Sequence, residues 1–134
     1  MQKTIALGLL LLACGISQAS DWVSVPLTNP SKVAMIDNDS VSISGNVRRA
    51  WFKLIMPPHS KKGVGMYENR YVAYALTRTA FDCQQKNSMT DGLQWFYEDG
   101  TNNTTPQSAP EWAPVAPDSM GDALLSYICA LKPK

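Results

Sequence analysis

The most reactive side chains in this sequence are three cysteines and a single histidine. A structural zinc site is usually built from four cysteine or histidine ligands, and a catalytic one from three protein ligands of which at least two are histidine or cysteine. His59 stands beside a Pro-Pro pair with no second histidine, and Cys83 and Cys129 are the two cysteines that lie beyond the N-terminal segment. The ligand set for such a metal is therefore missing, and we expect no metal site.

Other catalytic patterns are also weak. No nucleophile elbow of the Gly-x-Ser-x-Gly type accompanies His59, so a Ser-His-Asp triad has no support. Gly63 and Gly65 lack the third glycine and the strand-to-helix context of a phosphate-binding loop. Asp37 and Asp39 flank a polar turn, where aspartates usually form Asx-turns. We therefore predict no catalytic residues, no cofactor and no enzymatic activity.

The N-terminus predicts an export signal. Met1 to Lys3 give a short positive start, and Thr4 to Ala13 form an apolar run that is shorter than the roughly 20 residues of a membrane span. Ser17 to Ala19 place small residues at a cleavage site. The expected organisation is a signal peptide over residues 1–19 and one domain over residues 20–134, exported to the periplasm, the outer-membrane surface or the medium.

A second way to process the signal stays open. Leu11 to Gly15 resemble a bacterial lipobox, in which Cys14 would carry lipid after removal of residues 1–13 and attach the protein to a membrane. Cys83 and Cys129 remain in the mature chain whichever of the two cleavage sites is used. Two thiols outside the reducing cytosol tend to form a disulfide, and the alternative is a pair of buried free thiols.

The charge balance argues against a nucleic-acid partner. Removal of residues 1–19 takes Lys3 from the 12 basic residues and leaves 11 basic against 11 acidic side chains. A nucleic-acid-binding domain usually shows a clear basic excess. The 115 residues that remain are enough for one domain with its own core.

Hydrophobic alternation predicts short strands along the first two thirds of the chain. The expected strands are Trp22–Val25, Val33–Ile36, Val41–Ile43, Val47–Met56, Tyr71–Phe81 and Leu93–Tyr97. Gly45-Asn46 and Asp99-Gly100 are typical of hairpin turns. On the strand from Val47, alternate residues beginning with Ala50 share one face, and those beginning with Arg49 share the other.

The C-terminus changes to a helical period. Ser119 is a suitable N-cap, and Asp122 can reach back to it. Leu124, Ile128 and Leu131 lie on one side, with Leu125 and Cys129 extending the apolar stripe. The predicted fold class is α+β, an antiparallel β-sheet of about six strands packed against a C-terminal α-helix, with one disulfide.

Two basic clusters are candidate partner-binding residues, Lys61 with Lys62 and Arg48 with Arg49. The alternative is solvated surface charge without a partner. The polar loop from His59 to Asn69 carries the two lysines together with Tyr67, and binding residues often lie on loops held by a rigid sheet. We expect this loop to contact a protein partner if the chain is an adhesin.

A set of residues spread over the chain resembles a known family. They are Trp22-Val23, Asp37, Ser40, Ala50-Trp51, Phe81-Asp82-Cys83, Tyr97, Gly100, Trp112, Val115, Pro117-Asp118-Ser119 and Cys129. Together they resemble the bacterial surface-adhesin protein E-like domain family. The resemblance implies a disulfide-linked sheet and helix, binding of host extracellular-matrix or serum proteins, and a homodimer. The expected function is therefore an exported envelope adhesin; the alternative is a periplasmic structural or accessory protein without a host ligand.

Overall fold

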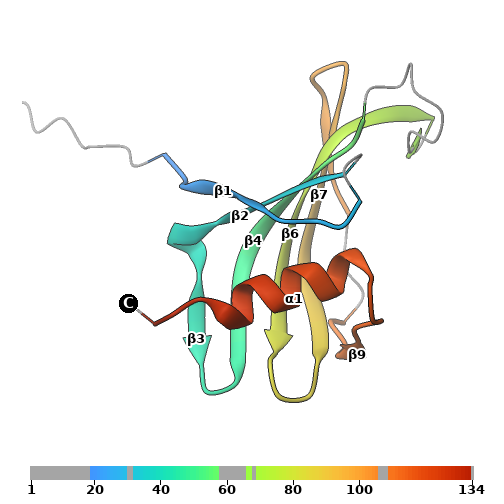
Figure 1. Cartoon of the computed structure of the whole chain (residues 1–134). Helices are drawn as coiled ribbons and strands as arrows, with labels where there is room; N and C mark the ends of the chain where they lie inside the picture. The colour runs from blue at the N-terminus through green and yellow to red at the C-terminus, as the bar shows by residue number, and fades with distance from the viewer. Residues whose placement is uncertain (1–18, 30–31, 58–65, 68, 106–108, 134) are drawn as a thin grey trace, which may run out of the picture.

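The structure is a computed structural model that describes residues 19–29, 32–57, 66–67, 69–105 and 109–133 (Figure 1). The export signal through residue 18, Cys14, His59, Lys61 and Lys62 lie outside the described residues. The elements are β1 (Trp22–Val25), β2 (Val33–Asp37), the 3-10 helix η1 (Asn38–Ser40), β3 (Ser42–Ser44), β4 (Val47–Ile55), β5 (Met66–Tyr67), β6 (Arg70–Asp82), β7 (Asn87–Tyr97), β8 (Asn102–Thr104), β9 (Ala113–Pro114) and α1 (Met120–Ala130).

Among the described residues, nine strands form one antiparallel sheet. Six of them follow one path in the order β1-β2-β4-β6-β7-β8. The long strand β4 is shared, because β3 pairs with its N-terminal part at Val47–Arg49 and β2 pairs with its C-terminal part at Phe52–Ile55. The predicted α+β fold of about six strands and a C-terminal helix is confirmed.

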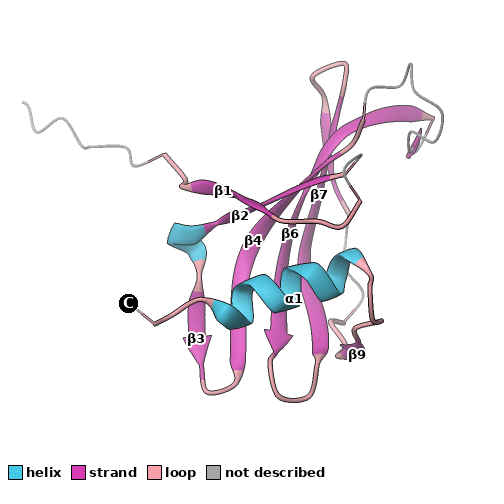
Figure 2. Cartoon of the chain, viewed as in Figure 1, coloured by secondary structure: helices cyan, strands magenta, loops and turns pink. Residues whose placement is uncertain are grey.

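The helix α1 lies across one face of this sheet, as Figures 1 and 2 show. Its Leu124, Leu125 and Ile128 are buried against the sheet. They meet Phe52 of β4 and Phe81 of β6, whose rings are 5.7 Å apart in an edge-to-face arrangement. Burial of these apolar side chains between helix and sheet is the main force that holds the two layers together.

The start of α1 is capped by side chains. Ser119 Oγ accepts a hydrogen bond from the Asp122 amide at 3.2 Å, as the sequence predicts. The Asp122 carboxylate, however, accepts from the amide of Asp118 at 3.0 Å, one residue before the N-cap. Asp118 has a positive φ of 59°, which turns its amide toward that carboxylate.

The disulfide between Cys83 and Cys129 joins the sheet to the helix. Cys83 follows the end of β6, and Cys129 lies in the last turn of α1, with a Cα–Cα distance of 5.8 Å. The predicted pairing is therefore present. In the described part of the chain, no helix is long and apolar enough to cross a membrane.

Four strands differ from the expectation. β5 lies within the segment from His59 to Asn69 that the sequence predicts to be a loop, and it pairs with Arg70 and Tyr71 of β6. β7 begins at Asn87, six residues before the predicted Leu93, and β8 and β9 lie beyond the last strand that the sequence predicts. The first two residues of β7, Asn87 and Ser88, are polar, yet they pair with Asp82 and Phe81 of β6. Pairing with a long central strand overrides a weak local preference.

Candidate binding face

The face of the sheet opposite α1 carries a continuous set of aromatic, aliphatic and charged side chains. Residues directly opposite in an antiparallel pair point to the same face, and neighbours along a strand alternate. Because Ala50 and Phe52 point to α1, the register assigns the following residues to the other side, which we call the open face: Trp22, Met35, Arg49, Trp51, Lys53, Ile55, Tyr74, Leu76, Arg78, Asp91 and Phe96.

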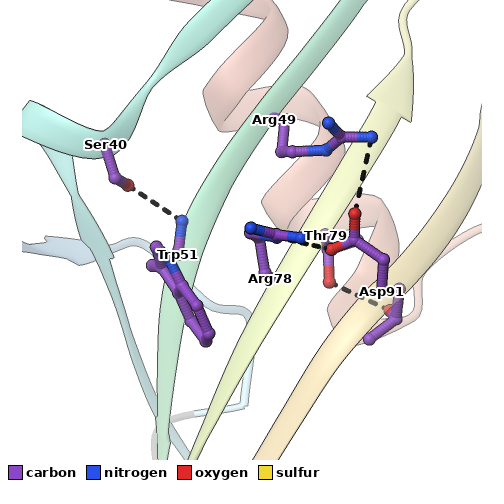
Figure 3. A network of polar contacts seen from close by, with 7 residues as sticks. Ser40, Arg49, Trp51, Arg78, Thr79 and Asp91 are labelled. Atoms are coloured by element: carbon purple, nitrogen blue, oxygen red, sulfur yellow. Dashed lines mark hydrogen bonds and ion pairs between the residues drawn. The ribbon is translucent and has the colours of Figure 1, made fainter. Parts of the chain in front are cut away.

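A charge cluster lies at the centre of the open face (Figure 3). Asp91 of β7 accepts a hydrogen bond from Arg78 Nε at 2.7 Å and forms an ion pair with Arg49 Nη2 at 3.5 Å. Two arginines therefore share one carboxylate, and the cluster carries a net positive charge. The two arginine side chains are 40% and 45% exposed, whereas that of Asp91 is 15% exposed, so the cations are the accessible part.

The arginines also change the acidity of the cluster. The hydrogen bond from Arg78 is the main reason that the pKa of Asp91 lies below its usual value, and the charges of Arg78 and Arg49 act in the same direction. Partial burial opposes them. The same hydrogen bond raises the pKa of Arg78. Both groups are thus held in their charged forms.

A β-bulge aims Asp91 at the two arginines. Arg78 is opposite Gly92, whereas Thr79 is opposite Thr90, so Asp91 is the extra residue on β7. A Cβ placed on Gly92 would lie 3.3 Å from the Trp51 ring. Because Gly92 has no Cβ, the Trp51 ring lies close against β7. The Cζ atom of the Arg78 guanidinium lies 5.9 Å from the centroid of the same ring.

Aromatic rings continue the open face beyond the charge cluster. Tyr74 and Phe96 stack with ring centroids 4.5 Å apart. Lys53 Nζ lies 4.3 Å from the centroid of Tyr74 and 5.9 Å from that of Trp22. All four side chains are half-buried rather than enclosed. The lysine is thus held between two rings by cation–π interactions while its charge remains near the surface.

The structure separates the predicted partner-binding arginines. Arg49 belongs to the open face, whereas Arg48 points to the helix side and donates hydrogen bonds to the carbonyls of Ile128 and Leu131 at the end of α1. Tyr67 lies in the two-residue strand β5, and its side chain is not among those described. Lys61 and Lys62 cannot be placed relative to either.

Sequence reasoning assigned no role to Lys53, Tyr74, Arg78 or Asp91. The alternation predicted along Val47–Met56 already grouped Lys53 with Arg49 on one face, but it did not say which face the core covers. No such signal exists for Asp91, because the direction of its side chain follows from a β-bulge that forms only when β6 and β7 pair. Among the described residues, no group of three or more His, Cys, Asp or Glu side chains could hold a metal. The open face presents groups suited to recognition.

Comparison with known proteins places the chain by sequence and by fold. Residues 22–130 match the family described as Surface-adhesin protein E. This match covers the sheet, the disulfide and the helix, and it agrees with the resemblance seen in the sequence. No curated protein matches the chain.

Solved structures of protein E from Haemophilus influenzae share the fold. One has 13% sequence identity and a TM-score of 0.57, and the match covers 89% of this chain and 91% of the other. A second crystal form has 11% identity and a TM-score of 0.54, with 83% and 97% covered. Protein E from a non-typeable strain has 14% identity and a TM-score of 0.53, with 89% and 82% covered.

Proposed function

This chain belongs to the surface-adhesin protein E family, and we propose that it is an exported, non-enzymatic bacterial adhesin that binds a protein partner through the open face of its sheet. The proposed partner is a host extracellular-matrix or serum protein. The compartment that fits this role is the envelope surface, reached through the N-terminal signal, with lipid on Cys14 as the alternative anchor.

The observation that carries the proposal is the composition of the open face. Trp22, Trp51, Tyr74 and Phe96 are half-buried, and three cations lie among them. The cores of protein interfaces are enriched in aromatic residues, methionine and arginine, and a few such residues carry most of the binding energy. A sheet holds these groups rigidly, so little conformational freedom is lost on binding.

The charges of the open face favour an acidic surface on the partner. Arg49, Arg78 and Lys53 outnumber the two carboxylates that the register places on this face, Asp91 and the buried Asp37 opposite Trp22. Such charges accelerate association and make it sensitive to salt. The stacked pair of Tyr74 and Phe96 supplies apolar area next to them, which mainly slows dissociation.

A charge reversal tests this face directly. Wild type, Lys53→Glu and the matched control Lys86→Glu are compared for binding to immobilised laminin and vitronectin. Lys86 is exposed in the turn between β6 and β7 and is not one of the open-face residues. Lys53→Glu should weaken binding about tenfold or more, which corresponds to ~1.4 kcal/mol, while Lys86→Glu should not. Equal binding by all three proteins would remove the open face from the proposal.

The second candidate is a periplasmic structural or accessory protein without a host ligand. It is favoured by the N-terminal signal, which predicts export without specifying the surface. Wild type that binds neither laminin nor vitronectin would support it. A homodimer through the open face is a further proposal, and sedimentation equilibrium of wild type and Lys53→Glu would detect it as a mass that falls with the substitution.

A further inference from the structure

The edge strand β3 has the properties of a docking site for an extended peptide. It pairs with β4 on one side, and no strand among the described residues pairs with its other side. Figure 1 shows β3 at the margin of the sheet. All three of its residues are exposed, and Ile43, a large apolar residue, is 41% exposed. Free strand edges are templates for pairing with another chain.

The register identifies the free backbone groups. The amide of Trp51 donates to Ser40 Oγ at 2.9 Å, so odd-numbered residues of β4 direct their backbone groups toward η1 and β3. Arg48 is even-numbered and therefore bonds to β6, which leaves its opposite residue, Ile43, in a position without hydrogen bonds to β4. The amide and the carbonyl of Ile43 consequently point to the free edge.

Each face of β3 is flanked by a pocket of different character. On the helix side, a pocket of about 150 Å³ is lined by Asn38, Val41, Ile43, Leu131 and Lys132. An apolar cavity of roughly this size can hold a benzene-sized group. On the open-face side, Ser42, Ser44, Val47 and Arg49 line a second pocket of about 290 Å³. The linings include two cations and no acidic residue.

Two of the lining residues each have a buried side-chain polar atom with no hydrogen-bond partner among the described residues. They are Oδ1 of Asn38, which lines the apolar pocket, and Nε of Arg49, which lines the polar one. Such orphaned atoms are costly when nothing pairs with them. Of the two, Arg49 Nε is a donor, and a carboxylate is the group that can accept from it.

From these observations we propose that β3 binds an extended segment of another protein as an added antiparallel strand. The segment alternates an aliphatic side chain opposite Ile43 with carboxylates on either side of it. The aliphatic group enters the pocket lined by Val41 and Leu131, and a carboxylate meets Arg49, whose guanidinium exchanges its 3.5 Å ion pair with Asp91 for the new one. Main-chain hydrogen bonds to Ile43 supply affinity and the two pockets supply specificity, as in other cases of strand addition. The proposal does not depend on the binding of matrix or serum proteins.

The test uses a blocked seven-residue peptide in which glutamate and valine alternate, with glutamate at both ends. Binding to the wild-type protein is followed by isothermal titration and by the amide resonance of Ile43. We expect saturable binding below 1 mM, a perturbed Ile43 amide, and a loss of about tenfold or more in affinity when lysine replaces glutamate. N-methylation of the valine amides, which would face β3, should abolish binding, whereas N-methylation of the glutamate amides should not.

Two protein variants complete the design. Ile43→Pro removes the outward amide, and it should fold because that amide makes no bond to β4 and proline is tolerated at such edge positions. It should lose binding at least about tenfold, and Arg49→Gln should reduce the preference for glutamate over lysine peptides. The proposal is overturned if the wild type does not bind the peptide at 1 mM or if the two N-methylated peptides bind equally. It is also overturned if the wild type is a dimer and Ile43→Pro makes it a monomer.

Discussion

The guanidinium of Arg48 on β4 donates a hydrogen bond of 2.7 Å to the backbone carbonyl of Ile128, near the end of α1. The same nitrogen donates to the carbonyl of Leu131. The last carbonyls of a helix have no partners within it, and a cation there also complements the helix dipole. A residue on the sheet thus caps a helix that begins 72 positions later in the sequence.

This contact predicts unequal roles for two neighbouring arginines. Arg48→Met should lower the free energy of unfolding by about 1.5–3 kcal/mol, because charged hydrogen bonds to partly buried carbonyls are lost. Arg49→Met should cost less than about 1 kcal/mol, because its ion pair is partly exposed and screened. Urea denaturation of both variants checks the difference. Equal destabilisation would contradict the assignment of Arg48 to the helix end.

The acidity of Asp91 predicts a pH-dependent contribution to stability. Its pKa in the folded protein lies below the unfolded value of about 3.9, mainly because Arg78 donates to it. A depressed pKa stabilises the fold above the unfolded pKa, and this contribution is lost as the pH falls through the folded pKa. Asp91→Asn should therefore be less stable than wild type at pH 7, by about 0.5–1 kcal/mol given the exposed arginines, and the difference should shrink in acid.

A double-mutant cycle isolates that interaction. Urea unfolding at pH 7 of Asp91→Asn, Arg78→Gln and the double variant should give a favourable coupling between the two residues. A gap between wild type and Asp91→Asn that stays constant from pH 7 down to strongly acidic conditions would show that the lost carboxylate charge is not its cause.

The disulfide predicts a large effect of reduction. Replacing Cys83 and Cys129 with alanine should cost about 2–5 kcal/mol, the range for small exported domains, because the bond restricts the unfolded chain over 46 positions. Thermal unfolding with and without reductant measures the loss. Non-reducing peptide mapping of the native protein should recover the linked pair, and two alkylatable thiols would contradict the bond.

The loop from His59 to Asn69 remains a predicted contact site. Lys61→Ala with Lys62→Ala should slow association with immobilised laminin or vitronectin and weaken its salt dependence, because exposed lysines act mainly on the encounter. Tyr67→Ala should speed dissociation. Rates at two salt concentrations, compared with those of Lys53→Glu, distinguish the loop from the open face. Unchanged rates in both loop variants would exclude the loop.

The mature N-terminus is predicted to be Ser20. Intact mass spectrometry of the protein from its native envelope should give the mass of residues 20–134 less the two hydrogens of the disulfide. A mass beginning at Cys14 with added lipid would instead establish the lipoprotein signal and with it attachment to a membrane.

Much of the fold was predictable from local patterns. The alternation around Phe52 placed Ala50 and Phe52 on one face, and the structure shows that this is the core face, since both residues are at most 1% exposed. The aspartate turn was also correct, since Asp37 accepts a hydrogen bond from the Asp39 amide at 3.1 Å. At Gly45-Asn46 the hairpin turn is present, but only Gly45 has a positive φ. These features depend on residues near in sequence, which explains why they could be inferred.

The sequence by itself determined the strand period around β1, β2, β4 and β6, the helical period of α1, the helix cap at Ser119 and the two cysteines beyond the N-terminal segment. Tertiary structure decided that Arg48 and Arg49 serve opposite faces, that a bulge brings Asp91 between Arg49 and Arg78, and that β3 keeps a free edge. Period and capping follow from the chemistry of neighbouring residues. Partners across a sheet follow from register between distant segments, and a shift of one residue would reverse every side chain on a strand.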